Sequence, residues 1–164
     1  MKREQARDIG LFFLLGFMEE RVALAAASRA IARLKAQYPD LSRKDLDPKQ
    51  IIIPIDAIIG VCREAWLAHR GQIQRRTPVA GQGGEEPSEP IGAWKVPPSL
   101  NIDVWANYQR DASDEDLMTL LFSLVLGISD DDLAEGFKTS VGTIRYRLGK
   151  GVRQLGLVSR GRVS

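Results

Sequence analysis

The chain has almost none of the side chains that build covalent cross-links or metal centres. Its 164 residues include one cysteine, Cys62, and one histidine, His69. A single cysteine excludes an internal disulfide, and one cysteine with one histidine is too few for a metal cluster. A chain without disulfides suits a reducing compartment, so we expect a cytoplasmic protein that carries no metal and no other cofactor.

Long apolar runs are also missing. Residues 9–18 form an apolar run of ten residues, which is too short to span a membrane. Basic residues precede this run and the sequence ALAAAS follows it, as in a secretory signal peptide. Because Glu19, Glu20 and Arg21 interrupt the run, we reject a signal peptide and expect no membrane partner. Apolar residues at helical spacing continue beyond the interruption, at Leu24, Ala27, Ile31, Leu34 and Tyr38.

Residue patterns typical of catalysis are absent from the sequence. It shows no Ser-His-Asp, Cys-His or paired-carboxylate arrangement. The glycine-rich stretch at residues 81–84 lies in a proline-rich segment, without the preceding strand and following helix of a phosphate-binding loop. We therefore expect a binding protein and not an enzyme.

The spacing of the apolar residues and the placement of proline and glycine predict an all-α protein of two small helical domains. Residues 5–37 form one helix broken near Gly16, or two in sequence, ending before Pro39, and residues 56–76 form another. Residues 77–113 contain five prolines and four glycines, which is typical of a linker. The second half of this linker is apolar enough to dock on a domain. We thus expect domains at residues 1–76 and 114–164, joined by a Pro/Gly-rich linker.

Charge is sorted along the chain. Residues 1–76 carry fourteen basic and nine acidic side chains, and residues 77–113 carry two and five. Residues 114–164 carry seven of each, but the acids all lie before residue 136 and the bases all after residue 137. An acidic helix followed by a basic helix indicates that one surface near the C-terminus is built to meet phosphates.

Two helix starts lie within this charged region. Ser129 is a good N-cap before Asp130, Asp131 and Asp132, and Ser140 is a second N-cap after a short turn. Apolar residues of the second helix form an inward stripe at Ile144, Leu148, Val152 and Leu155. Its opposite face carries Thr143, Tyr146, Arg147, Lys150 and Arg153. This pattern predicts a C-terminal helix-turn-helix whose second helix enters the major groove of DNA. A basic face is equally typical of the solvent side of a helical bundle, and charge alone does not distinguish that structure from a DNA-binding helix.

The same segment contains GIS at residues 127–129, LAE at 133–135, SVGTIR at 140–145, and then Arg147-Leu148. In content and spacing these stretches resemble region four of bacterial sigma factors, the domain that reads promoter DNA. The tail QLGLVSR at 154–160 is also similar to the end of a LuxR-type helix-turn-helix. This segment alone therefore leaves two families open.

The first domain shows a fainter resemblance of the same kind. The sequence LLG at 14–16 and an alanine-rich helix ending in IARL at 31–34 resemble the polymerase-docking part of sigma region two. The sequence VCREAWLAHRGQIQRR at 61–76 resembles the following helix, which has a basic end. Two domains and a linker in this order are similar to the small sigma factors of the extracytoplasmic-function type.

This resemblance implies promoter recognition by the helix-turn-helix. It implies that the N-terminal domain contacts the RNA polymerase core or an anti-sigma-type regulator. The residues expected at the DNA are Ser140, Thr143, Arg145, Tyr146, Arg147, Lys150 and Arg153. Further DNA contacts in the N-terminal domain are expected from Arg70, Arg75 and Arg76.

Two departures from the sigma pattern keep other functions open. The sequence VALAAAS at 22–28 replaces the acidic and amide side chains that the family presents to polymerase. We expect this face to be covered by the linker around Trp94 and Trp105, or by a second copy of the chain. Gly149 and Gly151 lie inside the second helix, where each costs about 1 kcal/mol relative to alanine. The alternatives are a sigma mimic or adaptor that does not initiate transcription, and a LuxR-type homodimeric regulator.

Overall fold

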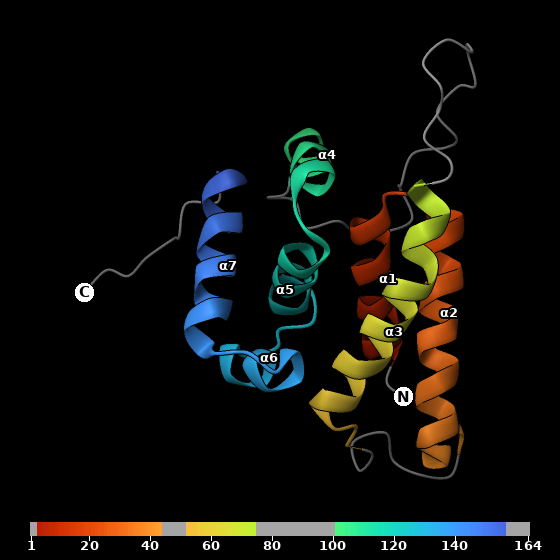
Figure 1. Cartoon of the computed structure of the whole chain (residues 1–164). Helices are drawn as coiled ribbons and strands as arrows, with labels where there is room; N and C mark the ends of the chain where they lie inside the picture. The colour runs from red at the N-terminus through yellow and green to blue at the C-terminus, as the bar shows by residue number, and fades with distance from the viewer. Residues whose placement is uncertain (1–2, 44–51, 75–100, 157–164) are drawn as a thin grey trace, which may run out of the picture.

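The computed structural model describes residues 3–43, 52–74 and 101–156. Every regular element among these residues is a helix (Figure 1), which confirms the all-α class. No helix among them is long and apolar enough to cross a bilayer. The elements are α1 (Arg3–Phe17), α2 (Glu20–Gln37), the short 3-10 helix η1 (Pro39–Ser42), α3 (Ile55–Gln74), α4 (Ile102–Asp111), α5 (Asp114–Leu124), α6 (Asp130–Phe137) and α7 (Val141–Gln154).

The N-terminal region is two helices in sequence, the second of the two predicted alternatives. The chain breaks at Met18, whose φ of 54° lies in the left-handed region, and at Glu19, whose backbone is extended. A non-glycine residue in the left-handed region ends a right-handed helix. Helix α2 then runs to Gln37 and stops before Pro39, as predicted.

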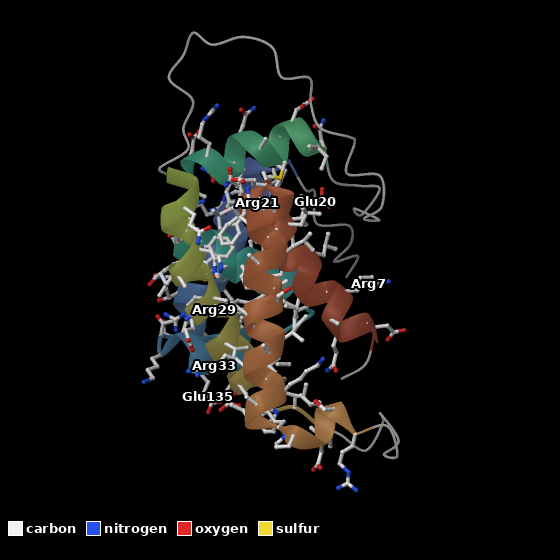
Figure 2. The ribbon with its side chains drawn as sticks, turned by 90° about the vertical axis from the view of Figure 1, so that its right-hand side faces the viewer. Arg7, Glu20, Arg21, Arg29, Arg33 and Glu135 are labelled. Atoms are coloured by element: carbon white, nitrogen blue, oxygen red, sulfur yellow. The ribbon has the colours of Figure 1, made fainter. Side chains whose placement is uncertain are left out.

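Helix α2 packs on both α1 and α3 (Figure 2) through small side chains. Its buried residues are Val22, Ala23, Ala26, Ala27, Ala30 and Leu34. The prediction that the linker or a second copy covers this face is therefore wrong, because α1 and α3 cover it. Alanines allow two helix backbones to approach closely. Trp105 lies against the end of α1 instead, and Trp94 falls outside the described residues.

Helix α4 forms within the predicted linker and docks on the end of α1. Its N-cap is Asn101, whose side chain accepts hydrogen bonds from the amides of Asp103 and Val104. The indole of Trp105 donates to the Leu15 carbonyl at 2.8 Å, and the Gln109 amide donates to the Gly16 carbonyl at 3.1 Å. Carbonyls in the last turn of a helix have no partner within that helix, so both bonds satisfy groups that α1 leaves open. The predicted docking of the linker's second half is confirmed for Trp105.

A continuous apolar core joins the N-terminal and C-terminal helices. The rings of Phe12 in α1 and Phe122 in α5 lie 4.5 Å apart between centroids. Gly136 in α6 lies so close to Ile59 in α3 that a Cβ there would approach the Ile59 Cδ1 to 2.6 Å. The helices of the two predicted domain ranges thus pack directly on one another, while the domain boundaries themselves stay a prediction.

Candidate nucleic-acid interface

The two C-terminal helices begin where the sequence predicts. The Ser129 hydroxyl accepts from the Asp132 amide at 3.2 Å and donates to the Asp132 carboxylate at 2.6 Å. The Ser140 hydroxyl accepts from the Thr143 amide at 3.1 Å. Helix α6 ends at Phe137, and its C-cap Lys138 has a left-handed backbone that directs its amide to the carbonyls of the preceding turn. Both predicted N-caps are confirmed, and a turn at residues 138–140 joins the two helices.

The outer face of α7 carries side chains that extend into solvent. The side chain of Arg145 is 69% exposed, and Tyr146 is 66% exposed. Arg145 Nε lies 3.2 Å from an Asp130 carboxylate oxygen at the start of α6. Arg153 is exposed and has no ion-pair partner among the residues that the structure describes. In Figure 1, α7 lies on the side of the molecule away from α1, α2 and α3, with α5 and α6 between.

Arg147 does not share this outer face, contrary to the prediction, whereas Lys150 has a side chain that is 41% exposed and is paired with α5. The Arg147 side chain is only 18% exposed, and its guanidinium contacts Glu115 and lies 3.7 Å from Asp116 in α5. Lys150 Nζ donates to Asp116 at 2.9 Å, and this bond and the carboxylate's charge raise the pKa of Lys150. Arg147 follows the buried Ile144 by three residues, so the two share one side of the helix. Both cations thereby join α7 to α5.

The two glycines of α7 have different surroundings. A Cβ on Gly151 would lie 3.0 Å from the Tyr108 hydroxyl and 3.1 Å from a Leu120 methyl. A Cβ on Gly149 would meet only the flexible end of Arg153, at 3.3 Å. A side chain at residue 151 would therefore press on Tyr108 and Leu120, whereas residue 149 has room for a methyl group.

The arginines of α3 are engaged within the molecule. Arg70 Nε lies 2.9 Å from an Asp114 carboxylate oxygen in α5, and its side chain is 17% exposed. Arg63 donates to the Gly136 carbonyl at 3.1 Å and lies over the Phe137 ring, 4.7 Å from its centroid. Arg70 thus joins α3 to α5, and Arg63 joins α3 to α6. The predicted contacts Arg75 and Arg76 fall outside the described residues.

From the sequence we did not identify Asp116, the residue of α5 that holds Arg147 and Lys150 of α7. Asp116 is only 8% exposed and contacts both Arg147 and Lys150. The acids at residues 114–116 lie in the first turn of α5, where negative side chains are common because the helix dipole is positive there. The one available signal was that Asp116 directly precedes Leu117, the first apolar position of α5.

Other chemistry is limited among the described residues. No group of three or more histidine, cysteine, aspartate or glutamate side chains is placed there to hold a metal ion. Burial raises the pKa of the Cys62 thiol to about 12, so this cysteine stays protonated. Cys62 and Trp66 are both fully buried, which confirms that they belong to the core. Comparisons of the chain with known protein families, with curated proteins and with solved structures find no match in any of the three.

Proposed function

We propose that this chain is a DNA-binding transcription protein of the sigma-factor kind, in which α6 and α7 form a helix-turn-helix. The observation that carries the proposal is the solvent-facing surface of α7, where Arg145, Tyr146 and Arg153 are exposed. This surface lies away from the N-terminal helices α1, α2 and α3 (Figure 1). The resemblance of residues 127–148 to sigma region four supports the same assignment.

The side chains of α7 divide into two groups with different roles in this proposal. Arg145 and Arg153 contact phosphates, and Tyr146 contacts the sugar-phosphate backbone or a base edge. Thr143, near the start of α7, is placed to approach base edges, because the N-terminal residues of a recognition helix read the bases. Arg147 and Lys150 hold α7 on α5 through Asp116, and they do not depend on DNA for a partner.

The salt dependence of DNA affinity tests this division. Each phosphate contact adds about one to the slope of log affinity against log salt concentration. With the full-length chain and a mixed-sequence duplex, Arg145→Gln and Arg153→Gln should each lower that slope by about one. Arg147→Gln and Lys150→Gln should weaken binding through a displaced α7 and leave the slope nearly unchanged.

Arg29→Gln is the matched control for these substitutions. Arg29 pairs with Glu64 at 3.6 Å, and its side chain is 52% exposed, against 69% for Arg145. It lies on α2 (Figure 2), across the molecule from α7. Its substitution should change neither affinity nor slope. A full-length chain that binds no duplex in a salt-sensitive way would refute the DNA-binding proposal. A slope lowered equally by Arg147→Gln would refute the division of roles.

A sigma mimic or adaptor is the second candidate, favoured by the contacts that the arginines of α3 make within the protein. Arg63 and Arg70 both contact the C-terminal helices, so in the described part of α3 they are not directed at DNA. The N-terminal helices are then suited to a protein partner, which we propose is the RNA polymerase core or an anti-sigma-type regulator in the cytoplasm. Affinity capture on the purified full-length chain from a bacterial lysate, probed for polymerase subunits and for other bound proteins, tests this. Capture of polymerase supports a sigma factor, and capture of only a regulator supports the mimic.

A further inference from the structure

A hollow of about 280 Å³ lies where the N-terminal and C-terminal helices meet. Gln5, Asp8 and Ile9 of α1 form one wall, and a second is formed by Ile53, which precedes α3, with residues 55 and 58 of α3. The third wall is the turn between α5 and α6 with the first turn of α6, residues 126–129 and Asp132. A ligand in this hollow would touch both halves of the protein at once.

Both apolar and polar side chains line the hollow. Four of its isoleucines are more than nine-tenths buried, namely Ile9, Ile53, Ile58 and Ile128. The polar side chains that line it are Gln5, Asp8, Ser129 and Asp132. Such a combination of apolar walls with a few polar groups is typical of sites for small molecules.

The charge around the hollow is negative. The described residues that line the hollow include two carboxylates and no basic side chain. Asp8 is offset by Arg7, whose guanidinium lies 3.1 Å away. Asp132 accepts a hydrogen bond from the neutral Ser129 hydroxyl, so its charge is not cancelled by that contact. The positive end of α6 contributes about half a unit charge, which Asp131 and Asp132 of its first turn outweigh even though Asp130 is paired with Arg145.

We infer that this hollow binds a small organic cation, a primary amine on a compact apolar body of about ten non-hydrogen atoms. A cavity of about 150 Å³ holds benzene, so the present volume accepts a phenyl ring with a short chain. The ring covers the buried isoleucines, and the ammonium group donates to the Asp132 carboxylate. This inference is independent of DNA binding, since it concerns a different surface.

Three probes of similar shape and different charge test the inference. Phenethylamine, 2-phenylethanol and phenylacetate are titrated into the isotope-labelled full-length chain and followed by the NMR signals of its backbone amides. With phenethylamine, the signals of Ile53, Ile58 and Asp132 should shift saturably, and that of Arg145 on α7 should not. A charge-assisted hydrogen bond should favour the amine over the alcohol about tenfold, and phenylacetate should bind more weakly than both.

Two neighbouring aspartates provide the matched variants. Asp132→Asn should abolish the preference for the amine over the alcohol, while Asp131→Asn, which alters a residue outside the hollow, should retain it. Melting curves without ligand show whether each variant is folded, and Asp8→Asn offers a second reduction of the negative charge if Asp132→Asn is unfolded. The absence of saturable shifts with phenethylamine would overturn the inference. Equal binding of phenylacetate, or an unchanged amine preference in a folded Asp132→Asn variant, would overturn it as well.

Discussion

Replacing the two glycines of α7 by alanine should have opposite consequences, although the residues are two positions apart in one helix. Gly149→Ala places its methyl group near only the end of Arg153, which can move. The substitution should therefore raise the free energy of unfolding by about 1 kcal/mol, the usual difference in helix propensity.

Gly151→Ala gains the same propensity but meets atoms that cannot move easily. Its Cβ would lie 3.0 Å from the Tyr108 hydroxyl and 3.1 Å from a Leu120 methyl. The Tyr108 ring packs against Trp105, with 5.7 Å between centroids, and Leu120 is fully buried. Excess volume in a packed core costs about 1–3 kcal/mol. We expect Gly151→Ala to be less stable than Gly149→Ala by a similar amount, about 1–3 kcal/mol.

Urea denaturation followed by tryptophan fluorescence measures this difference. Tyr108→Phe is the informative second substitution, because the Tyr108 hydroxyl is buried and has no hydrogen-bond partner within the described structure. Removing this hydroxyl should cost little by itself and should restore part of the stability lost in Gly151→Ala. Equal stabilisation by Gly149→Ala and Gly151→Ala would refute the packing argument, and so would a Tyr108→Phe background that restores nothing.

Three further measurements address the core and the junction between the two halves. Burial holds the pKa of Cys62 at about 12 instead of 9.0, so the buried neutral thiol stabilises the fold fully below pH 9 and progressively less as the pH rises toward 12. Between pH 9 and 12 the free energy of unfolding of the wild type should fall with pH, and that of Cys62→Ala should fall less steeply, by up to about 1.4 kcal/mol per pH unit. Arg63→Met removes the contacts with Gly136 and Phe137 and should cost about 1–3 kcal/mol, whereas Arg21→Met on the exposed face of α2 should be neutral in urea denaturation. Trp105→Phe leaves the Leu15 carbonyl without its indole donor and should cost about 1–3 kcal/mol, measured as a lower melting temperature.

The starts of the C-terminal helices were predictable from sequence because their signals are local. A serine N-cap acts on amides two or three residues away, so Ser129 and Ser140 identify α6 and α7 without knowledge of the fold. The inward position of Ile144 likewise follows from periodicity, and the residue is fully buried. The roles of Arg147 and Lys150 were not predictable in this way, because their partner Asp116 belongs to another helix, more than thirty residues earlier in the chain.

The position of α4 and the cover over α2 also depend on long-range packing. The prolines and glycines of residues 77–98 gave the whole connection the composition of a linker, although its last part forms a helix capped by Asn101. The alanine face of α2 suggested a missing partner because its sequence does not say which neighbour covers it. Both outcomes depend on how helices fit together in three dimensions, and periodicity within one helix carries no such information.

The packing of Phe12 on Phe122, together with the bond from Trp105 to the end of α1, bears on how this protein can be divided or recombined. A fragment containing only residues 101–164 would present Phe122 and Trp105 to water, and we expect such a fragment to self-associate instead of behaving as a transplantable DNA-reading unit. Fusion proteins and shuffled genes that exchange this segment would need to carry α1 and α3 with it. Substitutions that change the size of Phe12 or Phe122 should likewise be tolerated only in compensating pairs, so that the two halves of the chain must evolve together.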